Sequence, residues 1–450
     1  MSIAAITDKR VHVQPGQVHE VLSRHMLADG YDIVMDLRKS HGSWLFDAKK
    51  GRKMLDFFSN FASCPIGYNH PRMDNPEFRE RLADVALNKV ANSDIYTTAM
   101  AEFVETFSRI AIPPSHRKHL FFVEGGALAI ENSIKTAFDW KVRKNLEKGE
   151  SESCGEVMHL RDAFHGRSGY TLSLTNTADP RKTQYFPKFD WPRVPNPKLR
   201  FPLTPEGISE VERAETAAIE TAKKFIAERP GRIAAFIMEP IQGEGGDNHF
   251  RAEFFRAVRQ LCDENEMLLI YDEVQSGAGL TGKMWAFEHF GVEPDIICFG
   301  KKTQVCGFAS NDRIFDIDDN VFKVSSRINS TWGGNLTDMV RSQRYFEIIE
   351  EEKLVANAAR VGAEFLSGLE GLSNSMPKLI TNVRGRGLMC AFDLPSGEIR
   401  DKAIDAMEAN DLLVLSSGHE SIRFRPGLNL TSEEASEGIS RIEKSLRQVV

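Results

Sequence analysis

The chain has 450 residues, which is long enough for two or three domains with a sizeable apolar core. Its hydrophobic content of 41% and its net charge of -7 are ordinary for a soluble globular protein, and they favour neither a nucleic-acid-binding nor a membrane protein. The six cysteines are scattered without a C-x-x-C pair, which favours reduced thiols over a disulfide framework.

The N-terminal ten residues have no apolar core of secretory length, and no later stretch approaches a membrane span. We therefore expect a cytoplasmic protein. His19, Glu20 and His25 have the wrong spacing for the zinc-binding helix of a metalloprotease, so we predict no metal site.

Residues 1–75 are expected to form a lead-in segment. Within it, residues 41–58 have the pattern of two short strands joined by a turn. The stretch 59–71 carries aromatic and turn residues without periodicity. It could line a pocket, with Phe61 and Tyr68 as candidates, or it could be a plain surface loop.

Residues 76–335 alternate short apolar runs with helix-length segments. Helices are predicted at 127–141 and 251–265, where the apolar residues recur on one face. The strand-length runs lie at 120–123, 156–160, 234–238, 268–271 and 296–299. Such alternation predicts a mostly parallel sheet that is covered on both sides.

Residues 336–450 change in character. A long helical stretch at 337–369 is followed by a strand after a glycine turn within 383–395, and by further short strands and helices. Strand–helix–strand units of this length predict a second, smaller α/β domain. The predicted large domain is thus 76–335.

Two adjacent lysines, Lys301 and Lys302, follow the predicted strand 296–299 and the turn glycine Gly300. The carboxyl end of a buried strand is where α/β sheets place ligands. A desolvated lysine at that end can lose its proton and attack a carbonyl, which is Schiff-base chemistry. Two solvated loop lysines are the alternative.

Two more motifs follow predicted strands. Glu124-Gly125-Gly126-Ala127 opens a helix, whose free N–H groups and dipole could bind a phosphate, although glycine pairs at such turns often serve packing alone. Asp272 lies in Y-D-E-V-Q-S-G, and this carboxylate could meet a protonated ring nitrogen or simply cap a turn.

The motif A-F-H-G-R offers Phe164 to stack on a planar ring and Arg167 to bind a carboxylate. The motif E-P-I-Q-G-E-G-G places Glu244 on a glycine-rich turn. Taken together, the lysine, the aspartate, the helix N-terminus and the aromatic ring supply what pyridoxal phosphate requires of a protein.

On these motifs the chain closely resembles the fold-type I, class III (omega) aminotransferases over nearly its whole length. The strongest matches are Y-D-E-V-Q-S-G, E-P-I-Q-G-E-G-G, the lysine stretch and I-R-F-R-P near the C-terminus. The resemblance implies pyridoxal phosphate as the cofactor. It also implies the fold of type I pyridoxal-phosphate-dependent transferases, with a large domain and a smaller α/β domain built from the N- and C-terminal segments.

The resemblance assigns the Schiff base to Lys301, and an alternative alignment would select Lys302. It also implies the other cofactor contacts, which are Gly126 and Ala127 with the phosphate, Phe164 and Val274 with the ring faces, Asp272 with the ring nitrogen and Gln275 with the ring hydroxyl. Gly125 and Leu128 depart from the family, which usually has Ser or Thr and often Glu there. Thr331 would reach the phosphate of a neighbouring subunit, which implies a homodimer with active sites at the interface.

Within the family the chain is most similar to the L-lysine 6-aminotransferases, on G-G-A-L-A-I-E-N, F-G-K-K-T-Q-V-C-G and N-S-T-W-G-G-N-L-T-D-M-V-R. This similarity implies ping-pong transfer of the terminal amino group of L-lysine to 2-oxoglutarate. The products would be L-glutamate and 2-aminoadipate 6-semialdehyde, which cyclises to piperideine-6-carboxylate. Ornithine or 4-aminobutyrate as the donor, and a mutase or racemase reaction, are the alternatives.

Three charged residues would solve the problem of two unlike substrates. The resemblance implies that Arg167 binds the distant carboxylate of lysine and that Arg423 binds the carboxylate beside the reacting carbon of the keto acid. Lysine brings no anion to Arg423, and a buried unpaired guanidinium is costly. Glu244 matches the family residue that pairs with this arginine and then swings away.

Overall fold

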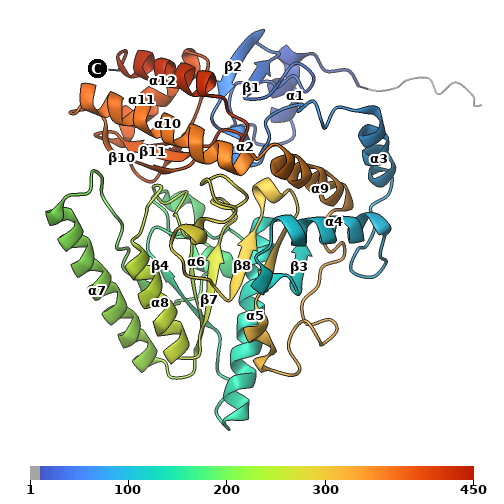
Figure 1. Ribbon diagram of the computed structural model, residues 1–450, viewed down its shortest axis with the longest axis vertical. Helices are drawn as coiled ribbons and strands as arrows, with labels where there is room; N and C mark the ends of the chain where they lie inside the picture. The colour runs from blue at the N-terminus through green and yellow to red at the C-terminus, as the bar shows by residue number, and fades with distance from the viewer. Residues whose placement is uncertain (1–10, 450) are drawn as a thin grey trace, which may run out of the picture.

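The computed structural model describes residues 11–449, so the N-terminal ten residues, on which part of the localisation prediction depends, lie outside the described residues. A large sheet with its helices forms the lower part of Figure 1, and two small sheets with the C-terminal helices lie above it. No helix within residues 11–449 is long and apolar enough to span a membrane.

The large sheet has seven strands and is mostly parallel, as predicted. Only β9 runs antiparallel to both of its neighbours. The strand order is β3 (His119–Val123), β9 (Cys306–Ser310), β8 (Ile296–Phe299), β7 (Leu268–Asp272), β6 (Ile233–Met238), β4 (Glu156–Leu160) and β5 (Arg193–Val194).

Successive strand residues point to opposite sides of the sheet, and helices cover both sides, so both faces are buried. On β7, Leu268 and Ile270 pack into a cluster with helix α5 (Gly126–Glu147). The alternating residues Leu269 and Tyr271 pack into the larger core with helix α8 (Ala252–Glu264). The central strands are therefore apolar along most of their length, which explains their clear signal in the sequence.

The remaining helices of this part pack mainly on other helices. Helices α4 and α9 contact each other, and α7 packs on α8 (Figure 1). Their bounds are α3 (Pro76–Ala86), α4 (Thr98–Ile110), α6 (Gly169–Leu174), α7 (Pro205–Glu228) and α9 (Leu336–Glu351).

Two smaller sheets combine the two ends of the chain. The four-stranded antiparallel sheet has the order β10 (Thr381–Arg386), β11 (Met389–Asp393), β14 (Ser421–Phe424) and β13 (Leu415–Ser417). The three-stranded sheet has the order β1 (Trp44–Asp47), β2 (Arg52–Asp56) and β12 (Leu412–Leu413). Because β2 pairs with β12, the N-terminal segment joins the C-terminal one.

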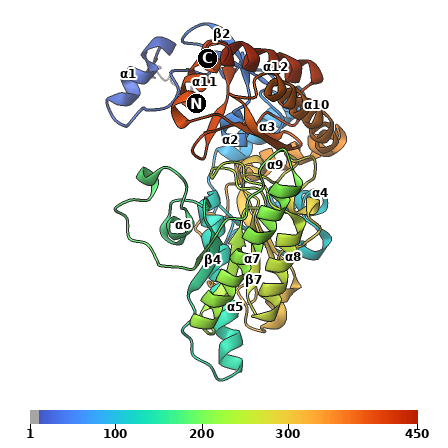
Figure 2. The ribbon, with the colours of Figure 1, turned by 90° about the vertical axis from the view of Figure 1, so that its left-hand side faces the viewer.

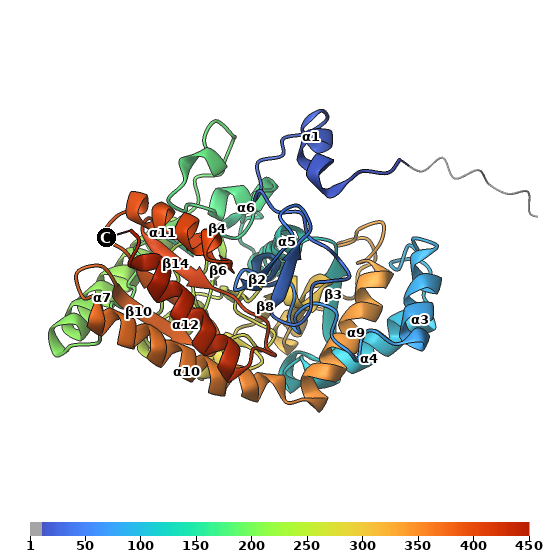
Figure 3. The same ribbon diagram turned by 90° about the horizontal axis from the view of Figure 1, so that it is seen from above.

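Three helices pack on these small sheets. Figure 3 shows α12 (Ser432–Leu446) lying between α10 (Leu354–Ser375) and α11 (Gly397–Ala409), and it contacts both. At the opposite end of the chain, the short helix α1 (Val18–Ser23) precedes β1.

The structure corrects one predicted element and confirms another. The helix predicted at 337–369 is two helices, α9 and α10, because Lys353 between them adopts a left-handed conformation with φ of 55°. The strand predicted after a glycine turn within 383–395 is confirmed as β11, which follows Gly387 with φ of +53°, whereas its hairpin partner β10 was not predicted.

The predicted loop at 59–71 begins with a left-handed turn, α2 (Ser59–Ala62), in which all four residues have φ between 41° and 64°. L-residues avoid this conformation at a cost of about 1–2 kcal/mol each. The turn is fixed at its start, since Asp56 accepts hydrogen bonds from the backbone N–H groups of Phe58 and Ser59 at 2.7 and 2.8 Å.

Candidate active site

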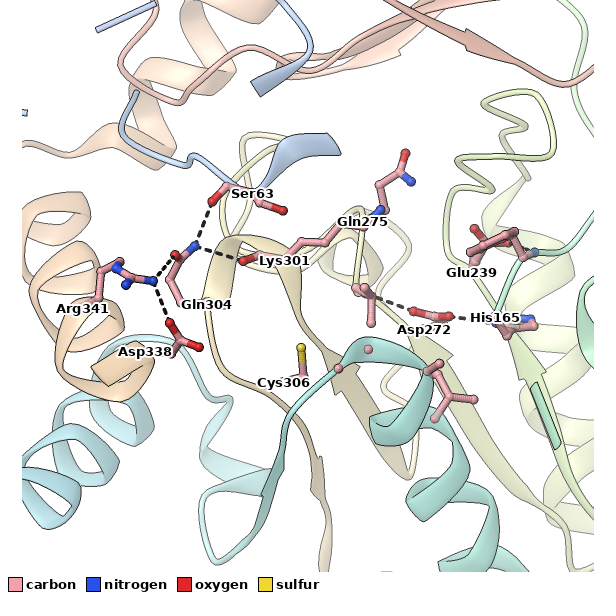
Figure 4. Close-up of a pocket in the computed structure, with 17 residues that line it drawn as sticks. Ser63, His165, Glu239, Asp272, Gln275, Lys301, Gln304, Cys306, Asp338 and Arg341 are labelled. Atoms are coloured by element: carbon pink, nitrogen blue, oxygen red, sulfur yellow. Dashed lines mark hydrogen bonds and ion pairs between the residues drawn. The ribbon is translucent and has the colours of Figure 1, made fainter. Parts of the chain in front are cut away.

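A cavity of about 570 Å³ lies where β6, β7 and β8 end, beside the N-terminus of α5. Figure 4 shows its lining residues, with Lys301 extending toward Gln275 across the cavity from the start of α5. The motifs after the separate strands therefore meet at one edge of the sheet, as the parallel topology requires.

Lys301 lines this cavity and Lys302 does not. The Nζ atom of Lys302 is buried and donates to the backbone oxygen of Gln275 at 2.6 Å. The pKa of Lys301 is lowered to about 8, mainly by burial and next by the charge of Arg423, while Asp272 opposes the shift. Lys301 is therefore the lysine whose amine faces the cavity. Its lowered pKa makes this amine easy to deprotonate.

The backbone of Lys301 is also unusual, with φ of 53° in a non-glycine residue. Gln304, which closes the same 3₁₀ turn, has φ of 62°. The Gln304 side chain donates to the backbone oxygens of Ser63 and Lys301 at 2.8 and 3.1 Å. Strained backbone held by surrounding hydrogen bonds is frequent at functional sites.

Asp272 is buried at the end of β7. Its Oδ1 accepts from the backbone N–H of Val274 at 3.0 Å, and its Oδ2 lies 2.8 Å from Nδ1 of His165. The Nε2 atom of His165 is buried without a hydrogen-bond partner in the described part of the chain. The histidine orients the carboxylate, which can then hold a positive charge in the cavity.

The part of the cavity beside the start of α5 can bind an anion. Helix α5 begins there, and Gly125 has φ of 102°, a conformation that favours glycine. A Cβ at Gly126 would lie 3.2 Å from Cγ1 of Val274. Backbone N–H groups of Gly126 and Ala127 in the first helical turn have no helical acceptor, so they and the helix dipole attract a phosphate.

The arrangement as a whole fits pyridoxal phosphate. Phe164 and Val274 both line the cavity and can cover a planar ring. A Schiff-base amine, a carboxylate for the ring nitrogen and an anion site lie around the same space. The glycine at 126 leaves the room that a ring beside Val274 requires.

Gln275 lines the cavity, and its side chain contacts two arginines that lie outside the cavity lining. Its Oε1 accepts from Nη1 of Arg423 at 3.0 Å and from Nη2 of Arg425 at 3.0 Å. Arg425 is fully buried and is paired with Asp247 at 2.5 Å. Gln275 is thus held by two arginines.

Arg423 is paired with Glu244 at 2.5 Å, between Nη2 and Oε2, and its side chain is only 3% exposed. The other oxygen of Glu244 accepts from Nζ of Lys182. Burial acts to raise the pKa of Glu244, but Arg423 and Lys182 outweigh it, and the pKa lies below its ordinary value. Glu244 is therefore a carboxylate held by two cations.

Six sequence-predicted residues other than Lys302 lie outside the cavity lining, and two of them form the Glu244–Arg423 pair. Arg167 and Thr331 are exposed, although Gly166 beside Arg167 does line it. Phe61 is also exposed, while Tyr68 is buried and donates to Asp56 at 2.5 Å.

The sequence reasoning missed several residues of the site. His165 lies within the motif that supplied Phe164, so a buried histidine beside a strand end could have been found. Ser63 lines the cavity from the stretch 59–71, for which a pocket-lining role was predicted through other residues, and Gln304 lines it from the lysine motif. Arg341 reaches it from α9, and its local sequence gave it no role.

The chain is similar in sequence to known proteins along nearly its whole length. Residues 26–446 match the model of the family described as aminotransferase class-III. An L-lysine-epsilon aminotransferase of Mycobacterium tuberculosis is 51% identical over 436 residues, which cover 96% of both chains. The mitochondrial 4-aminobutyrate aminotransferase of Homo sapiens is 32% identical over 423 residues, which cover 89% of this chain and 82% of that protein.

A solved structure is also similar. A structure of lysine aminotransferase from M. tuberculosis in the internal aldimine form superposes with a TM-score of 0.95 at 51% identity, covering 97% of this chain and all of that one. These matches confirm the resemblance indicated by the motifs, the fold class and the cofactor. The chain belongs to the class III aminotransferases, a family that depends on pyridoxal phosphate.

Proposed function

We propose that this enzyme transfers the terminal amino group of L-lysine to 2-oxoglutarate. The products are L-glutamate and 2-aminoadipate 6-semialdehyde, which cyclises to piperideine-6-carboxylate. The proposal is supported by the 51% identity to a protein named L-lysine-epsilon aminotransferase. The observation that carries it is the ion pair between Glu244 and Arg423 beside the cavity.

Bound pyridoxal phosphate supplies a carbonyl that takes up the amino group and a ring that withdraws electrons from the reacting carbon. Asp272 keeps the proton on the ring nitrogen, and His165 orients Asp272. Gly126 and Ala127 bind the phosphate through backbone N–H groups. The pKa of Lys301, lowered to about 8, allows its amine to accept and return a proton near neutral pH.

The Glu244–Arg423 pair explains how one site accepts two unlike substrates. L-lysine presents its terminal amine, so no carboxylate lies next to the reacting carbon, and Glu244 keeps the buried guanidinium neutralised. 2-Oxoglutarate brings a carboxylate to that position, and this carboxylate replaces Glu244 on Arg423. We assign the distant carboxylate of either substrate to Arg167, and Gln275 positions Arg423 by its hydrogen bond.

The donor can be tested by single-turnover absorbance of the cofactor-loaded enzyme. The enzyme is mixed with L-lysine, ornithine or 4-aminobutyrate in separate runs without a keto acid. We expect rapid loss of the visible absorbance with L-lysine alone, followed by a trapped cyclic imine. Rapid loss with ornithine or 4-aminobutyrate instead would move the donor to another branch of the family. A mutase or racemase would process its substrate without ever needing a keto acid.

We also propose a homodimer with active sites at its interface. Thr331 would bind the phosphate in the neighbouring subunit. The support is an apolar surface around Thr331, whose backbone oxygen accepts from Ser93. This surface has four side chains that are 41–79% exposed, namely Leu87, Ile95, Tyr96 and Trp332. The segments 87–96 and 331–332 that carry these side chains are joined by a hydrogen bond from the Asn92 N–H to the Trp332 backbone oxygen at 3.1 Å, and exposed apolar side chains gathered in one region favour a protein interface.

Mixing two variants tests the shared site. A hybrid dimer of Lys301→Ala and Thr331→Val subunits contains one intact site if Thr331 acts across the interface. It contains none if Thr331 acts within its own subunit. We expect the mixture to regain tight cofactor binding in half of the sites of the hybrid, and no regain would refute the proposal.

Two further proposals concern the whole chain. All six cysteines are free thiols in the structure, which supports a location in the reducing cytoplasm. The two small sheets and the large sheet support a division into a large domain, 76–335, and a small domain formed by 1–75 and 336–450. Helix α9 lies at the boundary, because it follows residue 335 and packs on α4 of the large domain.

A further inference from the structure

Glu244 has a second cationic partner that does not belong to the motifs. Lys182 ends a 3₁₀ turn, Pro180–Lys182, in the segment after α6, which stands out from the rest of the molecule on the left of Figure 2. Its Nζ donates to Oε1 of Glu244, while Oε2 is bound by Arg423. Each oxygen of the carboxylate therefore has its own cation.

The two cations differ in their surroundings. The Arg423 side chain is 3% exposed, whereas those of Lys182 and Glu244 are 22% and 23% exposed. Lys182 also lies 5.9 Å from the ring centroid of Phe164, which lines the cavity. A carboxylate that leaves Arg423 toward Lys182 thus moves from a buried partner to a more solvated one beside the cavity.

The backbone around Glu244 is fixed, so its carboxylate can change place only by rotating the side chain. The backbone oxygen of Glu244 accepts from the N–H of Gly418 at 3.0 Å, and that of Gly243 accepts from Oγ of Ser417 at 2.6 Å. On the other side, any Cβ at Gly245 would overlap the backbone oxygen of Asp162. The turn that carries Glu244 is therefore held from both directions.

We propose that Lys182 is a positioning residue that holds Glu244 when the carboxylate of the acceptor takes Arg423. The inference rests on the proposed function, since it requires a dicarboxylate acceptor. Without Lys182, an acceptor would leave the partly buried Glu244 carboxylate without a cation, and the cost would weaken acceptor binding. With Lys182, the released carboxylate keeps one of its two partners.

If Lys182 had the opposite role, its removal would change the acceptor affinity in the opposite direction. If Lys182 served only to hold Glu244 on Arg423, its removal would loosen that pair and would make Arg423 easier to reach. Acceptor binding would then be unchanged or tighter. The direction of the change in acceptor affinity therefore separates the two roles.

The test uses glutarate, a five-carbon dicarboxylate that lacks the reacting carbonyl, and measures its Kd by calorimetry on the cofactor-loaded enzyme. We expect Lys182→Met to weaken glutarate binding by about tenfold, the equivalent of one charge-assisted hydrogen bond. The half-reaction with L-lysine should change less than about twofold, because Glu244 stays on Arg423 in that step.

Two controls sharpen the result. Lys188→Met removes an exposed lysine from the same segment that forms no ion pair within residues 11–449, and it should bind glutarate like the wild type. In a Glu244→Gln background there is no carboxylate to hold, so adding Lys182→Met should cause no further loss.

Each outcome decides the question. Unchanged or tighter glutarate binding in Lys182→Met, or a tenfold loss that persists in the Glu244→Gln background, would overturn the inference and leave the proposed function intact. A wild-type enzyme that does not bind glutarate or 2-oxoglutarate at all would overturn both, because the acceptor would be wrong.

Discussion

The pKa of Lys301 makes a quantitative prediction for cofactor uptake. In the apoenzyme the attacking group is the neutral amine, and a pKa of about 8 makes about 9% of it neutral at about pH 7 and about 91% at about pH 9. An ordinary lysine would be only about 3% neutral at about pH 9. The uptake rate should therefore rise about tenfold over this range and then level off.

The assay follows the visible absorbance of the lysine-bound cofactor after pyridoxal phosphate is added to apoenzyme at a series of pH values. Lys301→Ala should give no such band at any pH. Lys302→Met, which keeps the side-chain volume but removes the donor to the Gln275 backbone, should lose some stability and still give the band.

Two results would refute this reasoning. A rate that continues to climb tenfold per pH unit beyond about pH 9 would mean that burial and Arg423 do not lower the pKa of Lys301. A band that survives in Lys301→Ala and disappears only in Lys302→Met would show that the aligned lysine is the wrong one.

Three further predictions address other features. Arg423→Ala should slow the half-reaction with 2-oxoglutarate by about tenfold to a hundredfold, the range for hydrogen bonds to a charged group, and should slow the L-lysine half much less. Equal losses in the rates of the two half-reactions, measured by stopped-flow absorbance, would contradict the proposal that a substrate carboxylate replaces Glu244 on Arg423. Lys353→Gly should raise the unfolding free energy by about 1 kcal/mol because its φ of 55° suits glycine, whereas Ala83→Gly in the right-handed α3 should lower it by about as much in urea titrations. The pKa of Glu239 is raised to about 7 by burial, so its contribution to stability is full below the ordinary glutamate pKa and is lost as pH rises through about 7. Glu239→Gln should therefore reduce the fall in stability between about pH 5 and pH 8, and an undiminished fall in denaturation curves at both pH values would contradict this.

The sequence predicted best those elements that depend on local patterns of apolar residues. The apolar run at 156–160 coincides with β4, and the helix predicted at 251–265 differs by one residue at each end from α8. Burial on both sheet faces and one apolar helix face leave clear patterns. β9 was not predicted, because Cys306–Ser310 contains a glycine and follows the lysine turn directly.

The helix break at Lys353 could not be read from the sequence either. Neither glycine nor proline marks it, and a left-handed lysine is set by how α9 and α10 pack rather than by propensity.

The site was predictable only where a motif follows a strand. Asp272, Gln275 and Lys301 are brought together by parallel strands that end at one edge, so their proximity follows from the topology. The choice between Lys301 and Lys302 depends on which side chain the turn directs into the cavity, and two adjacent identical residues give no signal for it. Lys182 approaches Glu244 from a segment 62 residues away, and a lone loop lysine is indistinguishable from a solvated one in sequence.

The left-handed turn at Ser59–Ala62 has a consequence for mutational tolerance. β-Branched side chains are the least compatible with this backbone, so a library that randomises the four positions should be depleted of valine, isoleucine and threonine and enriched in glycine, asparagine and aspartate. The same turn leads directly to Ser63, whose backbone oxygen accepts from Gln304 beside the lysine. If the N-terminal segment is exchanged with that of another family member, activity should persist only when the new segment places a backbone oxygen where the Gln304 side chain can donate to it.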